Sequence, residues 1–210
     1  NAGGTIAILP AATINAGGGT NVFANAGLFK KMGSGTITFD SALGGIRMNN
    51  TGSLEVRNGT LNLNGPISQM SATTLNGGTW SVYPGTTLSF GTGVVRTVGA
   101  STTINMLGAG TFSALSTLTT TNGTLNFTLG GIFQTTPFAG TFTNNGTIDL
   151  GADRWFKVNG NFTMGAAGIL NLDLASQTRY SHVIATGAAT LTGTAAFQLV
   201  SFTPTPGMVF

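Results

Sequence analysis

The sequence predicts an all-β protein, a parallel β-helix (β-solenoid) of about nine coils of roughly 22 residues each. Three observations lead to this fold class. A pentapeptide of Gly, Thr, apolar, polar and apolar residues recurs along the chain, its copies follow one another at a nearly constant interval, and Asn-Gly steps separate many of them. The apolar periodicity of an amphipathic helix, about 3.6 residues, is missing from the sequence.

The pentapeptide predicts the strands, because its ending alternates with the two-residue period of a strand that buries one face. The Asn-Gly steps predict the turns, since they suit backbone positions with positive φ. In chain order the copies occupy residues 4–8, 35–39, 59–63, 78–82, 123–127 and 146–150, with looser copies at 52–56, 168–172 and 193–197. The Asn-Gly steps begin at Asn58, Asn64, Asn76, Asn122, Asn145 and Asn159.

The interval between copies distinguishes a solenoid from a β-sandwich. The step from Gly123 to Gly146 and the step from Gly146 to Gly168 are each about 22 residues long. A sandwich has turns at a similar density but no reason to repeat one pentapeptide at that interval. A solenoid needs such an interval, because equivalent residues of successive coils then stack about 4.8 Å apart. The predicted rod is on the order of 43 Å long.

Stacking of the copies predicts columns of equivalent side chains. The polar residue at the centre of each strand is expected to form an outward structural ladder, in which amides hydrogen-bond to one another as in cross-β stacks. The ladder residues are Asn62, Asn105, Asn126, Asp149 and Asn171. The inward columns are expected to be Leu61, Ile104, Leu125, Ile148 and Leu170, and two positions on Leu63, Met106, Phe127, Leu150 and Leu172.

A single solenoid segment is expected over residues 1–210, with less regular terminal coils at 175–210, where the pentapeptide pattern relaxes. The first residues show neither an initiating Met nor a signal segment. The last residues read as the start of a further strand. We therefore expect this chain to be a fragment of a longer one.

Composition excludes several classes of protein. Charged residues are 6% of the chain, 8 Lys and Arg against 5 Asp and Glu, whereas soluble domains usually have roughly 25%. Lys30-Lys31 is the only basic doublet, so the basic footprint of a nucleic-acid-binding protein is missing. No apolar run approaches the roughly 18 residues of a membrane span. Without Cys there are no disulfides, and stability is expected to come from coil stacking.

Two stretches resemble repeats of very large secreted bacterial surface proteins. Residues 23–36 (FANAGLFKKMGSGT) and 49–61 (NNTGSLEVRNGTL) are similar to repeats of autotransporter passengers and related surface β-solenoids. Residues 180–197 and 202–207 resemble the closing coils of such passengers. The resemblance implies a secreted or cell-surface rod that serves as a stalk, an adhesin or a filament component. It implies no particular ligand.

The candidates for catalysis are few. A glycosidase needs two carboxylates that face each other across a sugar bond. Asp149 and Asp173 are the pair to test, because one coil step could bring their segments together; the alternative is that Asp149 replaces an Asn in the ladder. His182 is the only His, so a metal site built from several His cannot form. We expect no catalytic activity, no cofactor and no metal.

Two aromatic stretches are candidates for contact with a sugar. Arg154 and Trp155 stand where charged and aromatic residues mix, a pattern that suits sugar stacking or a cation–π contact. Trp80 and Tyr83 form a second candidate platform. The alternative for the first stretch is a broad coil edge with a surface ion pair that involves Asp153 and contributes less than about 1 kcal/mol. A carbohydrate-binding or carbohydrate-active β-helix is therefore one alternative function.

An ice-binding protein is another alternative, by analogy at the level of the fold alone. Such a protein is expected to present an unbroken Thr column on a flat solenoid face. The Thr-x-Thr candidates fall at different places in the repeat. They are Thr36 and Thr38, Thr117, Thr119 and Thr121, and Thr141 and Thr143.

The favoured function is an extracellular structural or adhesive rod without catalytic activity. Its expected partners are other copies of the chain, through end-to-end or lateral association, and an extracellular polysaccharide or a cell surface. No nucleic-acid partner and no membrane span are expected. Exposed coil edges are templates for added strands, and so few charges provide little repulsion against self-association.

Overall fold

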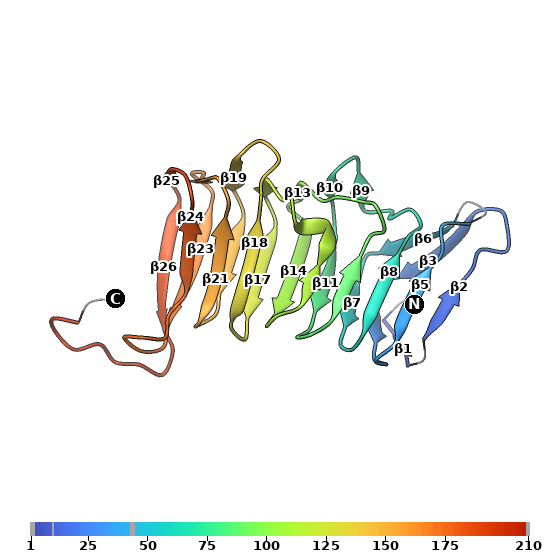
Figure 1. Ribbon diagram of the computed structural model, residues 1–210, viewed down its shortest axis with the longest axis horizontal. Helices are drawn as coiled ribbons and strands as arrows, with labels where there is room; N and C mark the ends of the chain where they lie inside the picture. Colours follow the sequence, from blue (N-terminus) through green and yellow to red (C-terminus); the bar gives the residue numbers. More distant parts are fainter. Residues whose placement is uncertain (1–2, 10, 43–44, 209–210) are drawn as a thin grey trace.

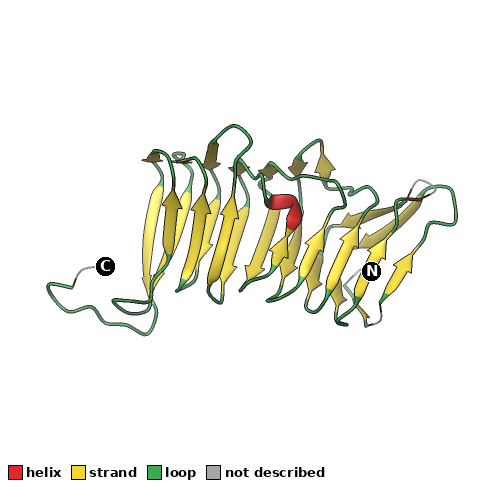
Figure 2. Ribbon diagram, in the orientation of Figure 1, coloured by secondary structure: helices red, strands yellow, loops and turns green. Residues whose placement is uncertain are grey.

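A computed structural model of the chain describes residues 3–9, 11–42 and 45–208. The described chain winds around one long axis, so that strands distant in the sequence lie side by side along the rod (Figure 1). Strands and short connections make up almost all of it, and a 3-10 turn, η2 (Ser113–Leu115), is drawn as helix in Figure 2. The predicted all-β solenoid is confirmed. It has about eight turns, so the expected number of about nine is roughly right.

One sheet runs the whole length of the rod, and neighbouring strands in it pair in parallel. We call it the nine-strand sheet. In spatial order it contains β1 (Thr5–Ile8), β4 (Leu28–Lys31), β7 (Ser53–Val56), β11 (Gly78–Val82), β14 (Thr102–Leu107), β17 (Thr124–Thr128), β20 (Thr147–Leu150), β23 (Ile169–Leu174) and β26 (Thr194–Leu199).

The second strand of each coil belongs to one of two sheets that follow each other along the rod. The five-strand sheet contains β2 (Ala12–Ile14), β5 (Thr36–Phe39), β8 (Thr60–Leu63), β12 (Thr87–Ser89) and β15 (Thr111–Phe112). The three-strand sheet contains β18 (Gly131–Thr135), β21 (Arg154–Val158) and β24 (His182–Ala185).

The third strand of each coil also belongs to one of two sheets. The two-strand sheet contains β3 (Asn21–Asn25) and β6 (Ile46–Asn50). The seven-strand sheet contains β9 (Met70–Ser71), β10 (Thr74–Leu75), β13 (Thr97–Val98), β16 (Thr120–Thr121), β19 (Thr141–Asn144), β22 (Asn161–Met164) and β25 (Ala189–Leu191).

Coil length varies around the predicted interval. The step from Ile104 to its register partner Leu125 is a short one, whereas the step from Leu54 to its partner Trp80 is several residues longer. The longer coil contains β9 and β10, which pair antiparallel as a hairpin at the edge of the rod. The extra residues therefore leave the parallel register of the other coils unchanged.

Alternate residues of the strands face inward and form one apolar core. Along the nine-strand sheet, the register stacks Trp80, Ile104, Leu125 and Ile148, all fully buried. Burial of a large apolar side chain stabilises by about 1.5–3 kcal/mol. Aromatic rings fill the wider coils; for example, the ring centroid of Phe156 lies 5.1 Å from that of Phe142. The sequence, which has no Cys, predicted that coil stacking stabilises the protein, and this apolar core is where the coils pack on one another.

The corner before the nine-strand sheet carries buried amides. Asn25 and Asn50 are fully buried, and the Asn25 Nδ2 donates to the Asn50 Oδ1 at 2.7 Å. The Asn50 Nδ2 in turn donates to the backbone oxygen of Thr79 at 3.1 Å. The first bond joins the two buried amides and the second reaches the backbone of the next coil, so both buried side chains are hydrogen-bonded, as buried polar groups require.

The same corner explains why Gly follows Asn there. A Cβ on Gly146 would lie 2.1 Å from the backbone oxygen of Gly123, one coil away. From the sequence, the Asn-Gly steps were expected to form turns because Gly tolerates positive φ. At Gly59, where φ is 69°, this reason holds. At Gly146 the close approach of two backbones requires Gly.

A lysine occupies one inward position of the nine-strand sheet. Lys31 is fully buried and stacks between Ile8 and Val56 in the register. Its Nζ donates to the backbone oxygen of Gly33, and to that of Asn58 at 3.0 Å. Burial lowers the pKa of the Lys31 amine from its usual 10.5, because desolvation disfavours the charged form.

Candidate functional site

The outward ladder lies on the nine-strand sheet. Asn105, Asn126, Asp149 and Asn171 are successive register neighbours on β14, β17, β20 and β23. The Asn126 Nδ2 donates to the Asn105 Oδ1 at 2.8 Å, and the Asn105 Nδ2 donates to the Ser81 Oγ at 2.9 Å. These bonds link β11, β14 and β17 through side chains as well as through the backbone.

The prediction that Asn62 belongs to this ladder is wrong. Asn62 lies on β8 in the five-strand sheet, where its register partners are Thr38 and Ser89. Leu61 and Leu63, expected in the inward columns of the ladder strands, are also on β8. The reason is that a coil contains more than one strand with the same alternation, so a pentapeptide copy can belong to either sheet.

A shallow groove of about 390 Å³ lies over the ladder. The ladder forms one side of it, and the outward residues two positions further along the strands form the other; these include Tyr83 and Leu107. At one end the Arg57 Nε donates to the Glu55 Oε2 at 2.6 Å, and the guanidinium carbon lies 4.8 Å from the centroid of the Tyr83 ring. Asp149 lines the groove at the other end.

Asp149 and Asp173 are brought close enough for their charges to interact. Burial raises the pKa of both carboxyls above 3.8, and the charge of Asp149 further raises the pKa of Asp173. A hydrogen bond from the Ala152 backbone N–H partly opposes this rise at Asp173. Both groups resist ionisation more than an exposed Asp does, and a raised pKa is one property of a general acid.

Two residues of the expected sugar-contact patch lie in the interior instead. Trp80 is fully buried in the inward column, and its Nε1 donates to the backbone oxygen of Gly77 at 3.1 Å. Arg154 is 1% exposed, and its Nη1 donates to the backbone oxygens of Gly108 and Gly130. Burial lowers the pKa of Arg154 to about 10, so the guanidinium remains protonated at neutral pH.

The surface ion pair suggested for this stretch has another partner. The Asp153 carboxylate pairs with Arg179, whose Nη2 lies 2.8 Å from the Asp153 Oδ2. Arg154 cannot fill this role because it is the inward residue at the start of β21. Arg154 shares the inward face of β21 with Phe156 and Val158, so its charge type was a misleading guide to its position.

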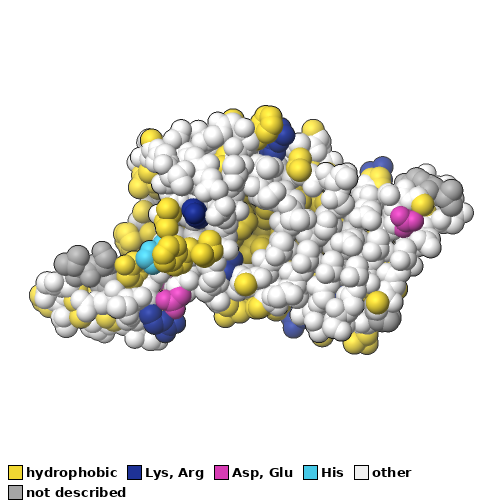
Figure 3. All heavy atoms as spheres, viewed as in Figure 1, with side chains coloured by type: hydrophobic (Ala, Val, Ile, Leu, Met, Phe, Trp, Pro, Cys, Tyr) yellow, Lys and Arg dark blue, Asp and Glu magenta, His cyan; other side chains and the backbone are white. Residues whose placement is uncertain are grey.

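Trp155 is exposed, in a strip of aromatic side chains on the three-strand sheet. The His182 ring lies between Trp155 and Tyr180, with 4.4 Å between its centroid and that of each neighbour. Trp155 and His182 are register partners. Figure 3 shows the imidazole in cyan among hydrophobic side chains. His182 covers part of the Trp155 ring, as the Arg57 guanidinium covers part of the Tyr83 ring.

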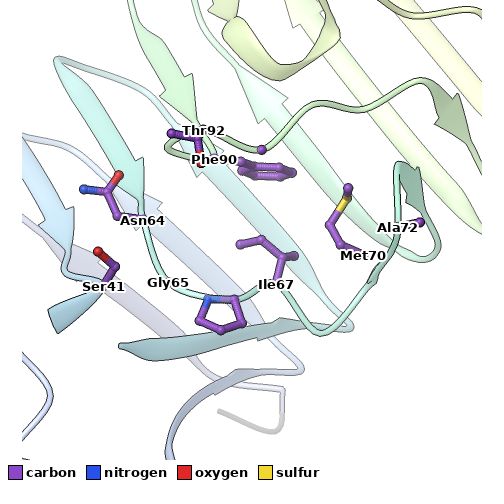
Figure 4. A pocket seen from close by; sticks show the side chains of 10 residues that line it. Ser41, Asn64, Gly65, Ile67, Met70, Ala72, Phe90 and Thr92 are labelled. Carbon is purple, nitrogen blue, oxygen red and sulfur yellow. The ribbon is translucent and has the colours of Figure 1, made fainter. Parts of the chain in front are cut away.

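A cleft of about 420 Å³ lies where the β9–β10 hairpin leaves the rod. Figure 4 shows Phe90, Ile67 and Met70 around this space, with Ser41 and Asn64 on its rim. An apolar floor with a polar rim is typical of small-molecule sites. Sequence analysis missed the cleft, because residues from three coils form it.

Threonines form an unbroken outward column on the seven-strand sheet. Six successive register partners, from β10 to β25, are all Thr and all at least partly exposed. A shorter column of four lies on the five-strand sheet. The longer column is Thr74, Thr97, Thr120, Thr143, Thr163 and Thr190, and the shorter one is Thr36, Thr60, Thr87 and Thr111.

Only some of the Thr-x-Thr candidates belong to these columns. Thr36 and Thr143 belong to them. Thr121 points inward, fully buried, and the Thr119 Oγ1 donates to the Arg96 backbone oxygen at 2.8 Å. The stretch 117–121 therefore does not present a face of free hydroxyls. Sequence reasoning missed the longer column because it runs across coils and each strand contributes one Thr.

Within the described ranges, no group of three or more His, Cys, Asp or Glu is arranged to hold a metal ion. In the same part of the chain, no helix is long and apolar enough to cross a membrane. Comparison with known proteins finds no match, whether among protein-family models, curated proteins or solved structures.

Proposed function

We propose that the chain is a segment of an extracellular structural or adhesive rod, a stalk, adhesin or filament component without catalytic activity. The observation that carries this proposal is the nine-strand sheet, which holds one parallel register along the whole rod. Stacked coils of this kind build long, stiff shapes by repetition. The resemblance of the repeats to secreted bacterial surface solenoids supports the extracellular location.

Self-association is part of the proposal. The outer edges of β1 and β26 pair with no strand of the described chain. On β26, Phe197 and Leu199 are 64% and 48% exposed. Unpaired edges with apolar side chains take up strands of neighbouring molecules, and the low charge of the chain allows close approach.

Small-angle X-ray scattering over a range of concentrations tests the shape and the association together. We expect an elongated particle about 40 Å long per copy, and longer particles as concentration rises. A compact, nearly spherical particle would overturn the rod. A reducing-sugar assay on neutral and acidic polysaccharides tests the lack of catalysis; release of reducing ends that Asp149→Asn abolishes would refute it.

An ice-binding function is the second candidate, and the Thr column of the seven-strand sheet favours it. Hydroxyl and methyl groups repeat there about every 4.8 Å along the rod, which is the regular array that ice binding requires. Thermal hysteresis should appear in the unaltered protein and fall in Thr120→Tyr, which interrupts the column. Thr38→Tyr, outside both columns, is the matched control. No hysteresis in the unaltered protein would dismiss this candidate.

A further inference from the structure

The groove over the ladder offers a ligand a regular row of hydrogen-bonding groups. Each primary amide has two N–H donors and a carbonyl with two lone pairs. In the ladder, Asn126 and Asn105 each use one N–H for the next rung, at 2.8 and 2.9 Å. Donors and acceptors of both amides remain available toward the groove. Successive rungs are about 4.8 Å apart, a spacing similar to the length of one sugar ring.

The opposite side of the groove is partly apolar. Tyr83 directly follows β11 and Leu107 ends β14, each two positions beyond a residue of the polar side, Ser81 or Asn105. One face of the Tyr83 ring is near the Arg57 guanidinium, which the Glu55 carboxylate holds in place. Ring C–H groups of a sugar pack well against such side chains, because aromatic rings bury large areas with a favourable geometry.

The charge in the groove selects the kind of sugar. At one end lie Arg57, whose charge is balanced by Glu55, and Lys30, the register neighbour of Glu55 on β4. At the other end Asp149 has no cationic partner among the described residues. Acidic chains, such as polyuronates or sulfated glycans, that run the length of the groove would therefore meet uncompensated negative charge at Asp149. A neutral chain of hydroxylated rings fits both sides of the groove.

We propose that this groove binds a neutral polysaccharide, laid along the rod axis with roughly one sugar ring per coil. The inference deepens the proposed function by naming what the rod holds, and it rests on that function. It assigns contact roles to Tyr83, Asn105 and Asn126. The proposed sugar site therefore lies on the nine-strand sheet and not on the three-strand sheet, where the sequence suggested a contact with Trp155.

Isothermal titration calorimetry with cellohexaose, laminarihexaose and maltohexaose as neutral probes, and hexagalacturonate as the acidic probe, tests the inference. We expect at least one neutral hexasaccharide to bind and the acidic one not to bind. Tyr83→Ala should weaken binding about tenfold, because loss of a stacking platform removes about 1.4 kcal/mol, near the upper end of the range for aromatic contacts. Asn126→Leu should also weaken it, by removing the hydrogen bonds of one rung.

Trp155→Ala is the matched control, because it removes an exposed aromatic side chain from another sheet. It should leave the affinity unchanged. Binding that Trp155→Ala abolishes and Tyr83→Ala spares would overturn the groove as the site. No binding of any neutral probe would overturn the inference too, as would preferential binding of hexagalacturonate. Scattering from the same samples reports the rod shape separately, so failure of the groove and failure of the rod are distinguishable.

Discussion

Gly146→Ala tests whether close packing of the coil corners holds the rod together. The added Cβ would lie 2.1 Å from the Gly123 backbone oxygen, whereas ordinary contacts begin at 3.4 Å. The two corners must therefore separate by more than an ångström. No side chain can rotate to relieve the contact, because the clashing atom belongs to the backbone.

The cost follows from what that separation breaks. The Thr147 backbone N–H donates to the Gly123 oxygen at 2.9 Å, and the Ile169 N–H donates to the Gly146 oxygen at 2.8 Å. Weakening two such bonds costs about 0.5–1.5 kcal/mol each, and overpacking costs about 1–3 kcal/mol. We expect a loss of about 3 kcal/mol in the free energy of unfolding. At about 2–4 °C per kcal/mol for a chain of this size, Tm falls by about 6–12 °C.

Gly17→Ala is the matched control. A Cβ on Gly17 meets no atom within 4 Å, and its φ is not in the left-handed region. This variant should be neutral or slightly stabilised, because Ala restricts the unfolded chain. Circular dichroism during thermal and urea unfolding measures both variants. A Gly146→Ala protein within about 0.5 kcal/mol of the parent, the range of ordinary surface substitutions, would refute the argument from corner packing.

Three further changes should alter stability in defined directions. Asn50→Ala removes the buried hydrogen bonds that Asn50 makes with the Asn25 amide and the Thr79 oxygen, so urea unfolding should show a loss of about 2–4 kcal/mol; a change under about 0.5 kcal/mol would contradict this. The lowered pKa of Lys31 means that the unfolded chain binds more protons just below pH 10.5, so the unfolding midpoint should rise as pH approaches that value, and Lys31→Met should flatten the rise; equal slopes would exclude Lys31 as its source. The raised pKa of Asp149 means that its ionised form opposes folding above pH 3.8, so Asp149→Asn should be more stable than the parent at pH 7 and lose that advantage below pH 3.8; an advantage that persists in acid would have another cause.

The sequence was sufficient to predict the fold. The two-residue alternation of apolar and polar residues identifies the strands, and the nearly constant interval between copies of the pentapeptide identifies the solenoid. The ladder from Asn105 to Asn171 follows from the nearly constant interval between equivalent positions of successive coils. The wrong placement of Asn62 in the ladder comes from the same pentapeptide pattern that correctly predicted the other ladder residues. Strands on different faces use the same alternation, so the pentapeptide identifies a strand without identifying its sheet.

The site was less predictable, because its residues come together only across coils. Trp80 and Arg154 were expected at the surface from their residue types, yet the register turns both inward. The groove beside Tyr83 and the longer Thr column each draw one or two residues from each coil that they cross. No window of consecutive residues contains either pattern, and only the exact register of neighbouring coils brings them together.

The hydrogen bonds of the ladder give the rod a direction. Asn126 donates to Asn105, which donates to Ser81, and the strands of the nine-strand sheet all run the same way. The two extremities are therefore chemically different surfaces. Copies that continue this arrangement would join tail to head, and such heterologous contacts generate open polymers unless their rotation closes a ring. Protein concentration and whatever terminates growth, rather than symmetry, would then set the length of an open assembly.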